Sequence, residues 1–596
     1  MREIQNPQNP QGPPGGNLRS IIALIFATIV MVSIQQFVIK PEQQKVEKKQ
    51  AEIQQAELAA KQAAAAAVAA SNAKFAPSAP VLAGMVRADS EKTTVVENDL
   101  YRITFSNRGG LVKSWILKKY TDDSGHPLEL VNQEAAQRYG YPLALWSGDV
   151  QLRDKLNSVL YVPSETGTAN APNELSFEYA DGDLAVKKSF SFDNTYVVSV
   201  KTSARRGGVD VTALPSWPAG FGDADGPPSY AEQHITYVTT PEPGARESVE
   251  RLKLDKKGKE ISGGRVQTGN YEWVGATDAY FGAIFLPEQP QNAAFAELRN
   301  AIEIPKTPGN PQSEKVKAEV LGVAAGALNA TSSVRLFAGP KAVDVLESVH
   351  SANGVNIHGA LDLGWFGFIG RPLFAWVRWT QRHWTSNWGW TIILVTVLIN
   401  LALLPLRISQ IKSSMKMQKV APQMMAVKEK YKKYKLDDPR RTEMQKEIAA
   451  LYKEHNVNPV GGCFPVLIQM PFLFAFYTML KNVIELRHAG WLYLTDLSAP
   501  DPKHIIPIAT VLLMVGLQRM MPATGMDKDQ QRLMMFMTPV MFAMFTWSVA
   551  SGLGLYIITG SVVQMVQQLV MNQTKMGREM RELEEKRALK AAEKRR

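Results

Sequence analysis

The chain alternates between polar stretches and long apolar runs. One run covers residues 18–39, after a segment rich in Pro, Gly, Asn and Gln. Five more lie in the C-terminal part, at residues 388–406, 463–482, 504–521, 532–549 and 552–571. About 20 residues of α-helix are needed to cross roughly 30 Å of hydrocarbon. The pattern therefore predicts a polytopic α-helical membrane protein with six spans, and the shorter runs predict a locally thinned bilayer.

A cleavable signal peptide is the main alternative for the first run. The apolar core of a signal peptide usually has about 7–15 residues and ends at small residues. This run is longer and ends near Gln35, Gln36 and Phe37. We therefore expect a retained first span at residues 18–39, preceded by a cytoplasmic N-terminus at residues 1–17.

Between the first run and the others, the pattern changes twice. Residues 40–90 are rich in Gln, Lys, Glu and Ala, then in Ala, Pro and Ser, a composition that cannot build a core and indicates a linker. Residues 91–345 contain short runs with β-branched and aromatic residues, such as LYRITF, LVKSWIL and FGAIFL, separated by turn-forming residues. These runs predict a large antiparallel β-sandwich. The single cysteine, Cys463, excludes an intramolecular disulfide and a Cys-rich zinc cluster, so this domain must be stable through its core alone.

Residues 346–387 end in a segment where Trp and Phe alternate with Arg371, Arg378 and Arg382. Such a mixture is typical of the boundary between lipid headgroups and hydrocarbon. We expect a linker here, followed by an amphipathic helix on the membrane surface.

The position of the charges matters more than their sum, because a net charge of +11 fits a nucleic-acid-binding protein as well as a membrane protein. Lys and Arg are concentrated at residues 407–462 and in the tail at 572–596. The positive-inside rule places both segments in the cytoplasm, with the short loop at 522–531, and places the β domain and the loop at 483–503 on the opposite side of the membrane. We therefore expect a multi-pass membrane protein with both termini in the cytoplasm.

The basic segment at 407–462 also has helical periodicity. Val420 and Met424 lie on one side of a first helix, and Asp438-Pro439 separates it from a second. This pattern predicts a cytoplasmic helical hairpin. A charged connector that only fixes the topology is the simpler interpretation.

Several motifs are similar to those of the YidC insertase family and occur in the order of that family. The longest, VNPVGGCFPVLIQMPFLFAFYTML at 457–480, combines a Gly-Gly break, two prolines and a lone Gln469. The others are NRGG at 107–110, NWG at 387–389, LLPLR at 403–407, DLSAPDP at 496–502 and SGLGLY at 551–556. The chain resembles the members with a large periplasmic domain over nearly its whole length.

The resemblance implies a membrane insertase and chaperone of the bacterial inner membrane, with the β domain and the loop at 483–503 in the periplasm. Five of the six spans would form its core around a hydrophilic groove, open to the cytoplasm and to lipid, and the periplasmic domain would have a supersandwich fold. Nascent inner-membrane proteins would pass through the groove into the bilayer, with or without the Sec translocon. Membrane lipids are further partners, and the basic tail and hairpin would contact the ribosome or anionic headgroups. No cofactor, metal, nucleotide or enzymatic activity is implied.

Polar side chains inside the apolar runs are the candidates for lining the groove, because they are costly against lipid. Thr396 and Asn400 share one helical face, and Tyr556 and Gln564, eight residues apart, share another. The full set is Thr396, Asn400, Gln469, Met470, Tyr556 and Gln564. For a single polar residue, a hydrogen bond that only holds helices together is the simpler interpretation, worth about 1 kcal/mol. For Met470, lipid-facing packing explains the residue as well as an adaptable substrate surface does.

Asn400 stands where the resemblance implies an arginine, so a fixed positive charge is missing at that position. Arg407 lies about two helical turns further along and can reach water at the groove mouth. A simple positive-inside anchor is the alternative role for Arg407.

Two other classes of protein remain open at this point. A membrane-tethered carbohydrate-active enzyme is one, but His126, His234, Asp223 and Asp225 have no spacing typical of paired catalytic carboxylates or metal ligands. A solute transporter is the other, but the spans contain no evident inverted repeat or intramembrane acid–base pair.

Overall fold

The computed structural model describes most of the chain beyond residue 84. The described residues are 85–223, 230, 232–241, 248–252, 261–307, 310, 312–432, 434, 438–455, 464–520, 528–575, 577–579 and 582. The predicted N-terminus, the first span, most of the linker, Cys463, most of the short loop at 522–531 and most of the basic tail lie outside them. The chain divides into two compact units, of which one includes Pro422–Glu454 and the other Pro80–Ala421 and His455–Arg596.

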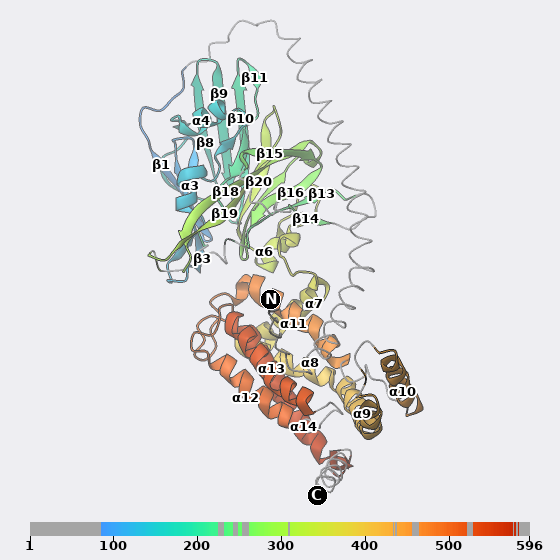
Figure 1. Ribbon diagram of the computed structural model, residues 1–596. Helices are drawn as coiled ribbons and strands as arrows, with labels where there is room; N and C mark the ends of the chain where they lie inside the picture. Colours follow the sequence, from blue (N-terminus) through green and yellow to red (C-terminus); the bar gives the residue numbers. More distant parts are fainter. Residues whose placement is uncertain are drawn as a thin grey trace, which may run out of the picture. The chain divides into compact units, whose positions relative to one another are not determined.

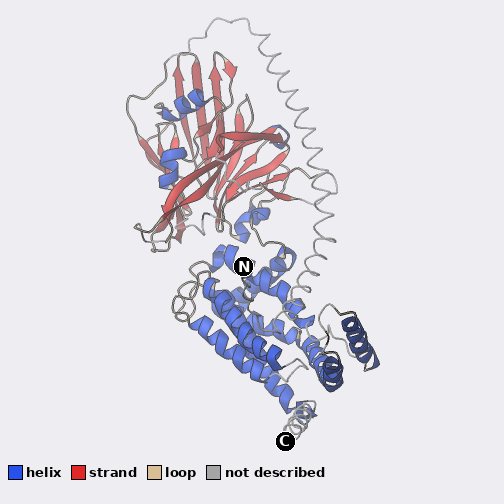
Figure 2. Ribbon diagram, in the orientation of Figure 1, coloured by secondary structure: helices blue, strands red, loops and turns tan. Residues whose placement is uncertain are grey.

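Three β-sheets form the N-terminal part of the larger unit, drawn red in Figure 2. The first has the order β4-β3-β2-β1-β7: Pro127–Glu129, Leu111–Thr121, Tyr101–Ser106, Thr93–Glu97 and Gly167–Asn170. The second has the order β14-β13-β16-β17-β20-β10-β9-β8-β6, with β11 paired to β10: Val249–Arg251, His234–Thr239, Tyr271–Thr277, Phe281–Pro287, Ser332–Pro340, Val197–Arg206, Leu184–Phe192, Asn173–Asp181, Val162–Pro163 and Val209–Asp210. The third has the order β15-β18-β19-β12-β5: Ile261–Gly269, Ala293–Pro305, Lys315–Gly326, Leu214–Trp217 and Leu145–Trp146. The predicted β-rich domain is therefore confirmed.

Burial along the strands shows why these sequences form sheets. In β9, buried and more exposed side chains alternate, as expected for a strand with one face in the core. In β16 and β17 every residue is buried, so both faces of these strands are covered. Between the sheets lie packed aromatic rings, among them Phe105 and Phe190 with centroids 5.3 Å apart. Two short helices, α3 (Gln133–Tyr139) and α4 (Val150–Ser158), begin at Asn132 and Asp149, whose side chains accept backbone N–H groups.

The NRGG motif is a turn between β2 and β3. Gly109 and Gly110 have φ angles of +71° and +56°, which favour glycine. Asn107 fixes the turn by donating from Nδ2 to the carbonyl of Tyr161 at 2.9 Å. The buried Lys188 donates to the carbonyls of both glycines, at 2.9 and 2.7 Å.

The C-terminal part of the larger unit is helical, and Figure 1 shows α12, α13 and α14 running side by side. Its helices and short turns are α6 (Val343–Ser348), η3 (His358–Ala360), α7 (Gly367–Thr380), η4 (Gln381–Thr385), α8 (Trp388–Ala402), α11 (Phe464–Asn482), η6 (Ile484–Leu486), α12 (Ile505–Met520), α13 (Lys528–Ser548) and α14 (Ser551–Gln573). Between α8 and α11 the chain forms α9 (Leu404–Lys430) and α10 (Arg440–Glu454).

The NWG motif is the corner between α7 and α8. Ser386 is left-handed, with φ +53°, and Asn387 caps α8 by accepting the N–H of Gly389 at 3.0 Å. A Cβ on Gly389 would lie 2.2 Å from the Trp491 ring, so only glycine fits there. The chain bends by 114° between the segment Gly367–Thr385 and α8.

Length and composition single out few of these helices. Among the described residues, α14 is long and apolar enough to cross a membrane alone, and the bent pair of Gly367–Thr385 with α8 would add a second. The helix α12 and the stretch Met535–Ser548 are apolar but shorter. The described residues thus combine a β-rich domain with one or two helices that are long and apolar enough to span a membrane.

Within the smaller unit, the last part of α9, from Pro422 onwards, contacts α10. The Tyr431 hydroxyl and the Lys430 ammonium both donate to Glu447, each at 2.8 Å. The Tyr452 hydroxyl contacts the sulfur of Met424 at 3.1 Å. A hairpin of two helices is thus formed around the predicted break near Asp438.

Candidate functional site

Helix α14 is central to the helical part, because it packs against both α8 and α12. Its SGLGLY motif allows this close approach. A Cβ on Gly552 would lie 2.9 Å from Leu480 Cδ2, and one on Gly554 would lie 2.3 Å from Ile506 Cγ2. Small residues at such positions let helix backbones come together in a membrane.

A first polar group joins the start of α9 to α14. Arg407 Nη2 donates to Gln564 Oε1 at 3.1 Å, and both side chains are half-buried. A guanidinium group can make five such bonds, so this cation keeps donors for another polar group. The structure thus brings together two of the predicted site residues, Arg407 and Gln564.

Thr396 and Asn400 lie on the adjacent part of α8 and are buried. Their side chains bond to their own helix: Thr396 Oγ1 donates to the carbonyl of Ile392 at 2.6 Å, and Asn400 Nδ2 to the carbonyl of Thr396 at 2.8 Å. The Asn400 carbonyl also accepts from Gln567 Nε2 at 3.4 Å, which links α8 to α14. In this structure, both side chains therefore form hydrogen bonds within α8. This agrees with the alternative given above for a single polar residue, that it only holds helices together.

A second polar group lies between α11 and α14. The Gln469 side chain is a hydrogen-bond partner of the Tyr556 hydroxyl. The Tyr556 ring stacks on Phe476, with centroids 4.5 Å apart. Met470, the next residue on α11 and also a predicted site residue, is 39% exposed. Tyr556 and Gln564 are eight residues apart on α14, so the two polar groups are roughly 12 Å apart along its axis.

Two further amides were missed by the sequence reasoning. Gln567 Oε1 on α14 and Gln518 Oε1 on α12 are buried and have no hydrogen-bond partner among the described residues. A buried acceptor without a donor costs about 1–3 kcal/mol, so such a group needs water or an incoming chain. Neither is a lone amide in an apolar run, because Gln518 precedes Arg519 and Gln567 precedes Gln568, so the signal that identified Gln469 does not single them out.

The end of α11 and the chain after it contact the β domain through basic and acidic side chains. Lys481 Nζ lies 2.5 Å from Glu232 Oε1, and Arg487 Nη1 lies 3.4 Å from Asp223 Oδ2. Burial, together with the neighbouring Asp278 carboxyl, raises the pKa of Asp223 well above its usual range, and Arg487 opposes this only in part. Asp223 therefore contributes to the contact between the helical part and the β domain.

No group of three or more His, Cys, Asp and Glu side chains that could hold a metal ion occurs within the described part of the chain.

Two family models cover most of the chain. The model of the 60Kd inner membrane protein family matches residues 379–579, and that of the YidC periplasmic domain matches residues 93–377.

Curated relatives match over most of their own length. "Membrane protein insertase YidC" of Geobacter metallireducens is 31% identical over 85% of this chain and 90% of the relative. The protein with the same name in Geobacter sulfurreducens is 30% identical over 80% of this chain and 85% of the relative. A solved structure, "Active YidC insertase crystal structure with the first transmembrane domain resolved", matches 83% of this chain and 95% of its own at 19% identity, with a TM-score of 0.33. With its helical part and its β-rich periplasmic domain each matched by a family model, this chain belongs to the YidC family of membrane protein insertases.

Proposed function

We propose that this protein inserts nascent membrane proteins into the inner membrane and assists their folding through the polar groups between α8, α9, α11 and α14. The observation that supports this most strongly is the Arg407–Gln564 bond of 3.1 Å, which joins the apolar start of α9 to α14. Polar groups of this kind are costly against lipid, and they suit a site that shelters polar parts of a substrate.

The six-span topology completes the proposal. Residues 18–39 form the first span, and α8, α11, α12, α13 and α14 form the other five, around a groove open to lipid and cytoplasm. Both termini and the α9–α10 hairpin are cytoplasmic, and the β domain is a periplasmic supersandwich. Short helices such as α8 match a locally thinned bilayer.

Insertion then takes three steps. The hairpin and the basic tail receive the nascent chain, the polar groups shelter its hydrophilic end, and its apolar segment moves into lipid beside α11 and α13. Burial of apolar surface supplies about 25 cal/mol per Å², so a segment of roughly 20 apolar residues needs no nucleotide. The groove only has to lower the kinetic barrier.

Arg407 supplies the positive charge that Asn400 does not. It is held by Gln564, about two turns from Asn400 towards the cytoplasmic end of α8. A charge at the mouth of the groove attracts acidic substrate tails at their entry rather than deep inside.

Nascent membrane proteins and lipids are the main partners. The Sec translocon and the ribosome are proposed as further partners. The ribosome would contact the basic tail and the hairpin through RNA phosphates, and anionic headgroups compete for the same charges.

The earlier enzyme alternative, a membrane-tethered carbohydrate-active protein, is wrong, because the relatives that match over the whole chain carry the name of an insertase. The transporter alternative has no specific observation in its favour.

Cross-linking to a stalled nascent chain tests the proposed path. In a Cys463→Ser background, new cysteines are placed at Gln469 and Gln564, and, as matched controls on the exposed face of α12, at Ile508 and Leu512, which are 57% and 69% exposed. A substrate with one cysteine in its first apolar segment should form disulfides at the first two positions and far fewer at the controls. Equal yields at all four positions would contradict a path along these polar groups.

A further inference from the structure

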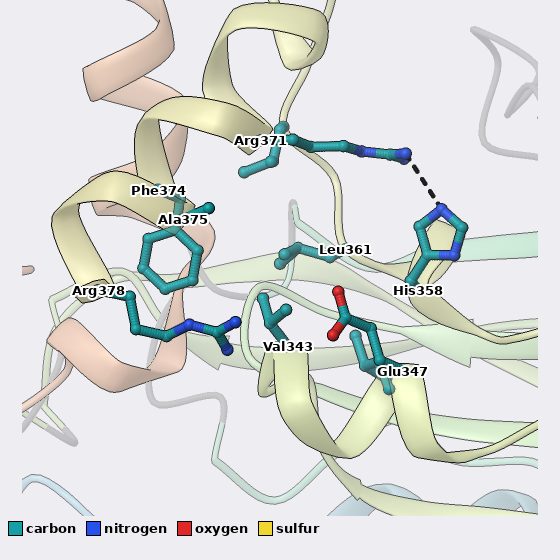
Figure 3. A pocket seen from close by; sticks show the side chains of 10 residues that line it. Val343, Glu347, His358, Leu361, Arg371, Phe374, Ala375 and Arg378 are labelled. Carbon is teal, nitrogen blue, oxygen red and sulfur yellow. Dashed lines mark hydrogen bonds between the residues drawn. The ribbon is translucent and has the colours of Figure 1, made fainter. Parts of the chain in front are cut away.

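Helices α6 and α7 and the turn η3 enclose a pocket of about 110 Å³ on the periplasmic-domain side of the helical part. This volume is comparable to that of cavities that hold one small organic group. Figure 3 shows the Glu347 carboxylate pointing into the pocket, Arg371 crossing its rim towards His358, and Arg378 entering from the opposite side. Leu361 and Phe374 supply apolar walls.

The charged side chains that line the pocket differ in their partners. Arg378 pairs with Asp344 at 2.5 Å, so its charge is compensated. Arg371 Nη1 instead lies 3.1 Å from the ring nitrogen Nε2 of His358, whose Nδ1 faces the side-chain oxygen of Asn356. This arrangement fits a neutral imidazole that accepts from Arg371. Within the described part of the chain, neither Arg371 nor Glu347 has a side chain of opposite charge at ion-pair distance. The pocket therefore offers one cation and one anion to a ligand.

The helix that carries Arg371 has three different faces. Leu373, Phe374 and Val377 are buried against the helical part. Phe368, Trp376 and Trp379 are exposed and share a second face, eight and eleven residues apart. Arg371, Arg378 and Arg382 share a third face, which adjoins the aromatic one. Exposed aromatic rings beside arginines are typical of a helix at the level of the lipid headgroups.

The 114° bend at the NWG corner agrees with this position. If α8 crosses the membrane, as in the proposed function, α7 runs close to the membrane plane. The aromatic face then meets the hydrocarbon, and the arginine face with its pocket lies at the level of the phosphates.

We propose that this pocket binds the headgroup of a zwitterionic phospholipid that carries a primary ammonium group. Arg371 binds the phosphodiester oxygens, and Glu347 accepts hydrogen bonds from the ammonium. The acyl chains lie along Phe368, Trp376 and Trp379. A bound lipid fixes α7 in the outer leaflet next to the start of α8. This proposal rests on the membrane placement of α8 but not on insertion activity.

Native mass spectrometry of the purified full chain tests the proposal. The protein in detergent is titrated with dihexanoyl phosphatidylethanolamine, with dihexanoyl phosphatidylglycerol, or with free phosphoethanolamine. We compare wild type with Glu347→Gln and Arg371→Gln. The control is Arg382→Gln, which removes an arginine of the same face that does not line the pocket. Both pocket side chains are exposed, and a thermal melt verifies the fold of each variant.

The expected result is saturable binding of the ethanolamine lipid in preference to the glycerol lipid. Loss of one charge-assisted hydrogen bond should weaken it roughly tenfold in each pocket variant but not in Arg382→Gln. Glu347→Gln should remove the preference for ethanolamine. The proposal is overturned by unchanged binding in both pocket variants, by a wild-type preference for the glycerol lipid, or by equally tight binding of free phosphoethanolamine, which would identify a soluble ligand. If the protein binds the lipid as predicted but does not insert substrates, the proposed function fails and the lipid site stands.

Discussion

Lys188 illustrates how a single buried charge can hold a turn in place. It is fully buried and donates to the carbonyls of Gly109, Gly110 and Leu143, at 2.9, 2.7 and 2.6 Å. Burial lowers the pKa of its ammonium group to about 7. Neither the burial nor the partners are visible in the sequence, where Lys188 reads as one of two adjacent lysines in a strand.

Replacing Lys188 by Met should destabilise the β domain strongly. The variant keeps an unbranched chain but leaves three buried carbonyls without their donor, and we expect a loss of about 3 kcal/mol or more in the free energy of unfolding. Chemical denaturation, followed by tryptophan fluorescence, measures the change. Lys187→Met is the control, because Lys187 is exposed and pairs only with Glu178, and it should change stability by about 0.5 kcal/mol or less. Equal losses in the two variants would contradict this role of Lys188.

The raised pKa of Asp223 predicts how the stability of the folded protein depends on pH. Because its pKa in the folded protein is raised, the folded state retains a proton that the unfolded state releases above the ordinary value of 3.8. Wild type should therefore lose stability relative to Asp223→Asn as the pH rises above about 4. The difference in Tm between the two proteins measures this effect. Asp183→Asn, which removes an exposed carboxylate that pairs with Arg206, should show no such growing difference. A difference that shrinks with rising pH would contradict a protonated Asp223.

Among the site residues, the sequence identified Gln469 as a lone amide in an apolar run, and Gln564 by its spacing from Tyr556 on one helix. Gln518 and Gln567 each lie beside another polar residue, so they do not stand out in this way and were missed. The bond from Arg407 to Gln564 could not be predicted, because it joins residues 157 positions apart and depends on how α9 packs on α14.

At the scale of the element, apolar runs predicted the positions of the helices well and their interruptions less well. Helices α11, α12 and α14 begin and end within a few residues of the apolar runs. The run at 388–406 contains two helices, because α8 ends at Ala402 and α9 begins at Leu404. Pro405 lacks an N–H and suits the first turn of a new helix, which hydrophobicity alone does not reveal. The order of the strands is also not visible in the hydrophobic pattern. Strands β10 and β17 both pair with β20, and such pairs join segments far apart in the sequence.

The packing of α14 gives the prediction that belongs to this scale. Gly554→Ala places a Cβ 2.3 Å from Ile506 Cγ2, so the Ile506 side chain or the helices α12 and α14 must shift. On the same helix, Gly560→Ala meets its nearest neighbour, Asn400 Nδ2, at an ordinary 3.9 Å. We expect Gly554→Ala to cost about 1–3 kcal/mol, measured by thermal unfolding in detergent, and Gly560→Ala to be tolerated. Equal stability of the two variants would show that α12 and α14 are not held this closely.

At the scale of the whole molecule, the chain joins a periplasmic β domain to an insertase core. Composition and periodicity indicate both parts, and the family motifs indicate the activity. The contacts between them, such as Lys481 with Glu232 and Arg487 with Asp223, could not be predicted. They join residues more than 200 positions apart and arise only when the two parts are folded.

The measurement that tests the central claim most directly is insertion of a short, translocon-independent membrane protein into liposomes that contain only this purified chain. Protection of the substrate from external protease is the readout. Wild type is compared with Asn400→Leu and with a combined Thr396→Leu, Gln469→Leu, Gln564→Leu variant. A control carries Ser548→Leu and Gln573→Leu at exposed positions.

We predict that wild type and the control insert the substrate, that Asn400→Leu inserts less, and that the combined variant fails while it remains folded. Insertion by the combined variant at the wild-type rate would contradict a functional groove between these helices. No insertion by folded wild-type protein above empty liposomes would contradict autonomous insertase activity.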